Sequence, residues 1–257
     1  MKHLFLLVVA AVFGIQTTQA QGTEDEGLFS HLGIGASVGT DGVGFDLAAP
    51  ITDWVSLRAG ISFLPKLKYK TDVDIDSNSP TIADNVDIEA KLNVFDFKLL
   101  ADFYPFEKSS FHITGGAFIG SSDFVKATNT SDLILDPSKY GMVGIKLGDR
   151  RITTDKNGNI TADVKVNSVK PYVGIGFGRA VPRKSRVSVS CDFGVKFWGS
   201  PRLGTMVEDD WDNTYYHKFK SKELDDKDDQ DLKDAMETME KISVYPVLNI
   251  RICGRIF

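Results

Sequence analysis

The stretch 187-VSVSCDFGVKF-197 carries the pattern that decides the fold. Its odd-numbered residues are apolar, whereas its even-numbered residues are Ser188, Ser190, Asp192, Gly194 and Lys196. Because successive side chains of a strand point to opposite faces, the stretch predicts a β-strand with one apolar and one polar face. It is longer than the roughly 5–6 residues of an ordinary strand, and about ten tilted residues are enough to cross a bilayer core.

Seven further segments alternate in the same way: 32–38, 43–49, 55–69, 86–103, 111–119, 172–181 and 242–256. In 86–103 the apolar residues move from even to odd positions between Val94 and Phe95. A β-bulge there would restore a single apolar face, because one extra residue shifts the alternation. Eight strands can close on themselves and leave no unpaired edge in lipid.

A soluble sandwich also has alternating strands, but its inner face must be apolar. Here the second face consists of Gly, Ser and charges of both signs, as in a small membrane barrel with lipid outside. Connection lengths alternate too: 50–54, 105–109 and 182–185 are short, whereas 71–85, 125–170 and 200–241 are long. The sequence therefore predicts an all-β, eight-stranded antiparallel up-and-down transmembrane β-barrel with short periplasmic turns and long extracellular loops.

Residues 1–20 have the features of a secretory signal peptide: Lys2, an apolar run over 4–13 and small residues before a cut after Ala20. The run is too short for a spanning helix, which needs about 20 residues. No later segment has an apolar run of that length. We expect Sec-dependent export, with 21–257 forming the barrel in the outer membrane of a Gram-negative cell.

The segment 171-PYVGIGFG-178, the Gly-rich first strand and the terminal Phe257 resemble the small outer-membrane β-barrel family of OmpA, OmpX and OmpW type, in the style of its Bacteroidota members. The resemblance implies insertion by the barrel assembly machinery into outer-membrane lipids and lipopolysaccharide. The last segment departs from the family pattern, because Leu248, Ile250 and Ile252 lie on the opposite parity to Phe257.

Charged residues on the second face predict the contents of the lumen. They are Asp46, Arg58, Lys66, Lys68, Asp96, Lys98, Asp102, Asp192, Lys196, Arg251 and Arg255. Eight strands leave an interior just wide enough for side chains, and buried charges must be paired. We expect a side-chain-filled lumen and a mainly structural or surface-exposed role. A narrow pore for small or apolar solutes is the alternative, and a lipid-modifying outer-membrane enzyme is a second one.

No catalytic, cofactor-binding or metal site is predicted, and we expect no enzymatic activity. His31 and His112 fall at periplasmic strand ends, which leaves only His217 near the outer rim, four residues before Ser221. Ser221 could instead cap a helix that runs to about residue 240, with Leu224, Leu232, Ala235, Met236 and Met239 roughly on one face.

Weak divalent cation binding is conceivable in the acidic loop over 206–240, whose formal charge is −8. Calcium could bind Asp225, Asp226, Asp228 and Asp229, although their spacing matches no EF-hand. The stretch 155-DKNGN-159 indicates a hairpin turn between 151–154 and 160–166, with a calcium turn as the alternative, and 71–76 carries a similar Asp alternation.

The remaining composition limits partners and cross-links. A pI near 5.4 argues against nucleic acid as a partner. Cys191 and Cys253 fall on opposite faces of consecutive strands, which predicts two free thiols. Aromatic residues near strand ends predict interface girdles: Trp54, Tyr69, Phe103, Tyr104, Phe106 and Trp198.

Overall fold

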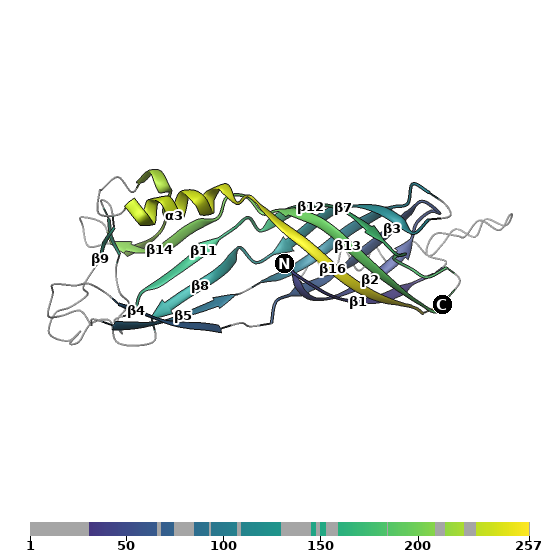
Figure 1. Ribbon diagram of the computed structural model, residues 1–257, viewed down its shortest axis with the longest axis horizontal. Coiled ribbons are helices and arrows are strands. Elements are labelled where there is room, and N and C mark those ends of the chain that lie inside the picture. The colour runs from purple at the N-terminus through teal and green to yellow at the C-terminus, as the bar shows by residue number, and fades with distance from the viewer. Residues whose placement is uncertain are drawn as a thin grey trace.

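The computed structural model of this chain describes residues 31–65, 68–74, 85–92, 94–106, 109–129, 145–147, 150–152, 159–183, 185–208, 214–223 and 230–256. Eight strands close into an antiparallel barrel, in which the last strand pairs with the first (Figure 1). They are β1 (Gly33–Gly39), β2 (Gly42–Pro50), β3 (Val55–Phe63), β6 (Phe95–Phe103), β7 (Phe111–Gly120), β12 (Val169–Phe177), β13 (Val187–Phe197) and β16 (Val244–Arg255). The predicted eight-stranded up-and-down barrel is confirmed. The predicted signal peptide and Phe257 lie outside the described residues.

The barrel has the predicted polarity, with apolar side chains outside and mostly polar ones inside, where Leu100, Phe118, Tyr172 and Val247 also form a small buried cluster. In β13 every odd-numbered residue except the half-buried Val195 is exposed, with Val189 at 61% and Phe193 at 55%, whereas Asp192 is 4% exposed. In β16 Ile250 and Ile252 point outward and Arg251 is buried, so the parity read from the sequence is confirmed in the last strand.

The same alternation explains the positions of the two cysteines. Cys191 is exposed on the outside and Cys253 is buried inside, and both are free thiols, as predicted.

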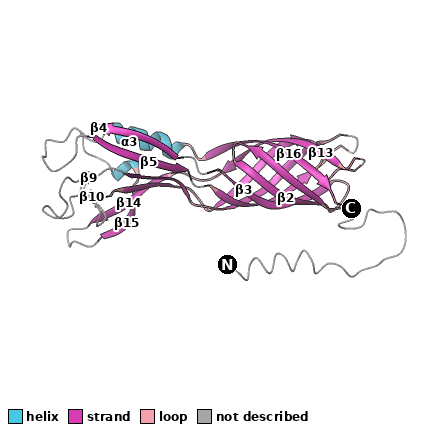
Figure 2. Cartoon of the chain, turned by 90° about the horizontal axis from the view of Figure 1, so that it is seen from below, coloured by secondary structure: helices cyan, strands magenta, loops and turns pink. Residues whose placement is uncertain are grey.

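The long connections form a second sheet beyond one end of the barrel, which we call the extension (Figures 1 and 2). Its strands are β4 (Lys68–Asp74), β5 (Asn85–Leu92), β8 (Asp123–Asn129), β9 (Ile145–Leu147), β10 (Arg150–Ile152), β11 (Thr161–Lys165), β14 (Arg202–Glu208) and β15 (Thr214–Lys218). The order β4-β5-β8-β11-β14 repeats the barrel order β3-β6-β7-β12-β13. The extension therefore prolongs part of the barrel wall, and the expectation of loops was wrong for most of these segments.

Two predicted strands are each divided between the barrel and the extension. Segment 55–69 forms β3 and the start of β4, and segment 86–103 forms β5 and β6. The prediction of a bulge near Val94–Phe95 was also wrong. The chain passes there from the extension, where β5 pairs with β4, into the barrel, where β6 pairs with β7. Segment 172–181 begins earlier than predicted, at Val169, and its strand ends before Gly178, whose φ of 115° stops the extended backbone.

The change of parity at Val94 marks an inversion of polarity. Val94 and Val166 line a cavity at the mouth of the lumen, so alternation places Ala90 and Val164 on the lumen side of the extension. Ala90 lies opposite Ala127, and Ala127 lies opposite Ala162. These apolar residues of β5, β8 and β11 thus share the inner face, whereas the apolar residues of the barrel share the outer face.

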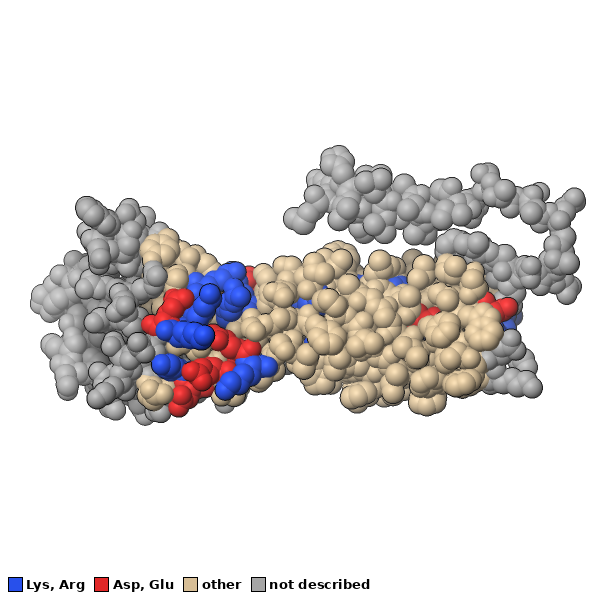
Figure 3. Space-filling model, turned by 90° about the horizontal axis from the view of Figure 1, so that it is seen from above, with Lys and Arg blue, Asp and Glu red and all other residues tan. Residues whose placement is uncertain are grey.

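The outer face of the extension is correspondingly charged. Exposed residues on it include Lys68, Asp87, Lys91 and Lys126. In the space-filling view, charged residues gather on the extension and are sparse over the barrel wall (Figure 3).

The predicted hairpin around residue 157 was wrong. β10 and β11 do not pair with each other, because both pair with β14. Ile152 lies opposite Val207 and Ala162 lies opposite Thr205, so the two strands follow one another along a single edge of β14. Residues 153–158 lie outside the described residues.

The predicted helix is confirmed over its second half. Ser221 begins a 3₁₀ turn, η1 (Ser221–Glu223), and α3 covers Gln230–Lys241. Met236 of α3 packs against Val207 and Phe219, whereas Ala235 is exposed. Leu224 and the Asp225–Asp229 candidates lie outside the described residues. Within the described part of the chain, no helix is long and apolar enough to cross a membrane.

The end opposite the extension carries the predicted short connections, and we call it the turn end (Figure 2). There Arg183 donates a hydrogen bond to Asp53 at 2.9 Å, which joins two of these turns. Trp54, Phe103 and Phe106 are exposed near it, as an interface girdle requires. Tyr104 and Trp198 are buried instead, and the side chain of Tyr69 lies outside the description.

If lipid surrounds the barrel, a charge on its outer wall should be costly. Ile250→Arg, near the middle of β16 and 52% exposed, should destabilise the protein by about 2–4 kcal/mol in bilayer refolding titrations. Met206→Arg on the extension, where the side chain is 40% exposed, should cost far less. Equal costs for the two variants would contradict a lipid-facing barrel wall.

Candidate functional site in the barrel lumen

Oppositely charged residues fill the lumen in equal numbers. Among the described residues, five buried cations and five buried carboxylates point into it: Arg58, Lys98, Lys170, Lys196 and Arg251, with Asp41, Asp46, Asp96, Asp102 and Asp192. Each of these side chains lies within 4.0 Å of an opposite charge. Balanced pairing is what makes burial of so many charges tolerable.

The first cluster surrounds Arg58 of β3. Its guanidinium lies 2.7 Å from Asp102 Oδ1 and 3.0 Å from Asp192 Oδ2. Asp102 also accepts a hydrogen bond from Thr114 Oγ1 at 2.7 Å, and Asp192 lies 2.7 Å from His112 Nε2. One arginine thus connects β3 with β6, β7 and β13 across the interior.

The second cluster surrounds Asp46 of β2. Arg251 Nε lies 2.9 Å from Asp46 Oδ1, and Lys98 Nζ lies 3.3 Å from Asp46 Oδ2. Arg251 also donates to the Ala180 carbonyl at 2.9 Å, which ties it to the segment after β12. Since all three charged side chains are buried, their partners must satisfy them within the protein.

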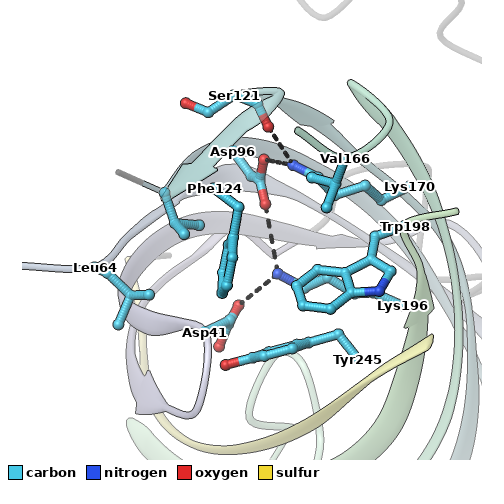
Figure 4. Close-up of a pocket in the computed structure, with 11 residues that line it drawn as sticks. Asp41, Leu64, Asp96, Ser121, Phe124, Val166, Lys170, Lys196, Trp198 and Tyr245 are labelled. Atoms are coloured by element: carbon cyan, nitrogen blue, oxygen red, sulfur yellow. Dashed lines mark hydrogen bonds and ion pairs between the residues drawn. The ribbon is translucent and has the colours of Figure 1, made fainter. Parts of the chain in front are cut away.

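The third cluster closes the lumen at the extension end (Figure 4). Lys170 lies 2.6 Å from Asp96 Oδ1, and Lys196 lies 3.5 Å from Asp96 Oδ2 and 3.7 Å from Asp41 Oδ2. Asp41 comes from the tight turn between β1 and β2, where Gly42 has a φ of 96°.

An aromatic layer lies around the third cluster. The ring centroid of Trp198 lies 4.9 Å from those of both Phe124 and Tyr245. Trp198 Nε1 donates to the Ile242 carbonyl at 2.8 Å, and the Tyr245 hydroxyl donates to the Thr40 carbonyl at 2.6 Å. These bonds fix the rings and hold the β1–β2 turn against β16.

Inward-facing glycines make room for the large charged side chains. A Cβ added at Gly35 would lie 2.5 Å from Arg251 Nε. One at Gly176 would lie 2.5 Å from both Asp192 Oδ1 and His112 Nε2. The Gly-rich strands noted in the sequence therefore serve the interior packing.

Three cavities in and around the lumen are small. The one at its mouth, beside Lys196, has a volume of about 20 Å³, and those at its middle and at the turn end have about 10 Å³ each. A water molecule needs roughly 10–15 Å³ of such space. The interior around these residues is packed side chain against side chain, as expected for eight strands.

Eight of the predicted inward charges are buried in the lumen: Asp46, Arg58, Asp96, Lys98, Asp102, Asp192, Lys196 and Arg251. Lys68 was wrongly placed, because it belongs to β4 and its side chain is 58% exposed. Arg255 lies half-buried at the turn end and donates to the Arg183 carbonyl. Lys66 lies outside the described residues.

Among the charged residues and histidines of the interior, sequence reasoning missed Asp41, Lys170 and His112. His112 shares the parity of Thr114 in β7, so its position inside could have been read from the alternation. Lys170 was missed because the strand begins earlier than predicted, and Asp41 because it sits in a turn.

The structure does not bring His217 to Ser221. His217 Nε2 lies 2.7 Å from Glu223 Oε2, and Ser221 Oγ donates to Glu240 Oε2 at 3.0 Å. The described residues include no group of three or more His, Cys, Asp or Glu that could hold a metal ion.

A smaller polar cluster lies on the outer face of the extension. Tyr216 donates a short hydrogen bond to Asp163, and Lys165 lies 3.2 Å from Asp123 and 4.4 Å from the centre of the Tyr216 ring. Burial, followed by the hydrogen bond to Asp163, raises the pKa of Tyr216. Burial lowers the pKa of Lys165, but Asp123 and Asp163 outweigh it and raise that pKa overall. Both shifts favour the protonated forms, a charged Lys165 and a neutral Tyr216.

Removal of one lumen charge should leave its partner buried with too little opposite charge nearby. Arg251→Met leaves Asp46 with Lys98 alone and should cost about 3–5 kcal/mol of unfolding free energy. The matched control is Arg183→Met, which breaks the exposed pair with Asp53 and should cost at most about 1 kcal/mol. Denaturant titration of the refolded protein measures both, and a small loss for Arg251→Met would mean that the lumen is hydrated.

No protein-family model matches this chain, and no curated protein sequence matches it. Three solved structures are similar in chain path. CarO2 of Acinetobacter baumannii is 19% identical with a TM-score of 0.47, and the match covers 89% of this chain and 99% of that one. CarO of the same organism is 15% identical with a TM-score of 0.43, covering 86% and 96%. A major outer membrane protein from Thermus thermophilus is 14% identical with a TM-score of 0.34, covering 88% and 98%. At such identities and TM-scores these likenesses say nothing of what this chain does.

Proposed function

We propose that this chain is an integral outer-membrane β-barrel protein with a mainly structural or surface-exposed role, whose closed lumen anchors the extension outside the cell. The observation that carries the proposal is the combination of an apolar outer wall with a charge-paired, side-chain-filled interior. A soluble barrel would need the reverse arrangement, because water would surround its outer wall.

The outer wall supports the membrane placement. Its exposed apolar residues come from all eight barrel strands and include Ile34, Phe45, Leu57, Leu99, Ile113, Ile175, Phe193 and Ile250. Exposed apolar surface that continues around a closed barrel is far larger than the patches found on soluble monomers. Barrel closure also leaves no unpaired backbone groups in lipid.

The lumen supports a structural role over the narrow pore. Arg58 and Arg251 reach partners on other strands, and the cavity beside them is about the size of one water. A pore for small or apolar solutes would require these paired charges to separate. The lipid-modifying enzyme loses its main support, because His217 and Ser221 bind different carboxylates.

Several finer expectations belong to this proposal. The OmpA, OmpX and OmpW-like character rests on the residues 171–178 and on the Gly-rich first strand. Insertion by the barrel assembly machinery, contact with lipopolysaccharide and Sec export follow from that resemblance. Weak divalent cation binding at the acidic loop stays a prediction, since Asp225–Asp229 lie outside the described residues.

Planar-bilayer recording tests the closed lumen. The refolded full chain should insert without steady conductance, because the charge pairs and aromatic rings occupy the lumen. A general porin recorded in the same bilayers is the positive control, and vesicle flotation confirms insertion of this chain. Reproducible unitary conductance steps from the inserted protein would establish the pore instead.

Surface proteolysis tests the orientation. A protease added to intact cells should cut within 206–240, because a charged outer face suits the extension to water outside the cell. The barrel strands should survive as a protected fragment on immunoblots. Cleavage that requires a breached outer membrane would place the extension in the periplasm.

A further inference from the structure

Three lysines lie side by side on neighbouring strands of the extension, close to the barrel. Lys68 of β4 is directly opposite Lys91 of β5, and Lys91 is directly opposite Lys126 of β8. All three are exposed, and we call them the lysine row. Like charges directly opposite each other destabilise a sheet, so this register needs a compensating negative charge.

The protein supplies only part of that charge. Glu89 Oε1 lies 2.7 Å from Lys91 Nζ and 3.6 Å from Lys68 Nζ. No ion pair joins Lys126 to a described residue. Asp163 lies opposite Lys126, but Tyr216 and Lys165 already bind its carboxylate. The row therefore presents more positive charge than Glu89 neutralises.

The row lies just beyond the polar layer of a bilayer, and its lysine side chains are long enough to reach that layer. Phe63 and Phe95 pair at the end of the barrel, and Phe95 is 40% exposed. Lys91 lies four residues beyond Phe95, which is about 13 Å along the strand or about 10 Å along the barrel axis at a tilt near 40°. The headgroup layer is about 5–8 Å thick on each side, and long lysine stems can extend back into it.

We propose that Lys68, Lys91 and Lys126 form a binding site for the phosphate of an outer-leaflet lipid headgroup. The proposal rests on the membrane placement argued above. The ammonium groups of Lys91 and Lys126 would bind the phosphate oxygens. Glu89 would keep the side chains of Lys68 and Lys91 in place. Bound phosphate supplies the negative charge that the lysine register lacks.

The test uses the purified full chain in a neutral, phosphate-free detergent, with phosphatidic acid as the lipid probe and native mass spectrometry as the readout. The triple variant Lys68→Gln/Lys91→Gln/Lys126→Gln should bind phosphatidic acid at least tenfold more weakly, since each lysine near a lipid surface contributes about fivefold. The matched control Lys218→Gln/Lys220→Gln/Lys241→Gln changes the same net charge at other exposed lysines of the extension. It should bind like the unmodified protein.

Further measurements identify the source of the phosphate and distinguish failure of the phosphate site from failure of the proposed membrane function. Inorganic phosphate at the same concentration should bind negligibly; if it displaced the lipid equally well, the site would be one for free anions and the lipid proposal would be overturned. Equal affinity of the triple and control variants would also overturn it. Vesicle flotation of the same protein preparations, after transfer from detergent to lipid, tests insertion. A chain that fails to insert contradicts the proposed membrane function. An inserted chain whose lipid binding is unchanged in the triple variant contradicts only the phosphate site at the lysine row.

Discussion

Charge balance inside the barrel is the constraint on which the rest of the structure depends. Five buried cations face five buried carboxylates, and a charge without a partner in that space would cost several kcal/mol. Most of the pairs connect strands that are not neighbours in the sheet: Arg58 of β3, for example, reaches Asp192 of β13. Cross-lumen pairing therefore ties the wall together from within, in addition to the hydrogen bonds between adjacent strands.

Glycine makes that pairing sterically possible. An eight-stranded barrel has little interior space, and the arginine side chains are among the largest that it could hold. Gly35 and Gly176 leave the volume that Arg251 and the His112–Asp192 pair occupy. The glycines of the inner face thus provide the space that its large charged side chains need.

The inversion of polarity between barrel and extension sets a boundary. In the barrel the apolar residues face outward, and in β5 and β11 they face the lumen side. The chain makes this change over a few residues around Val94, between the end of β5 and the start of β6. The proposed membrane placement would explain the change, because the same wall would then meet hydrocarbon below this level and water above it. If lipid surrounds the barrel, the side chains of the lysine row reach the level of the bilayer phosphates.

Short-range alternation explains what the sequence by itself determined: eight barrel strands, their inner and outer faces, most of the lumen charges and two free thiols. A side chain's face depends only on parity within its strand, so Cys191 and Cys253 could be assigned without any knowledge of neighbours. Only the tertiary structure decided that the parity change at Val94 is a change of sheet instead of a bulge. The same holds for β10 and β11, which share the edge of β14, and for Asp41, which reaches Lys196 from a turn. These features depend on pairing between segments far apart in the chain, which local periodicity does not record.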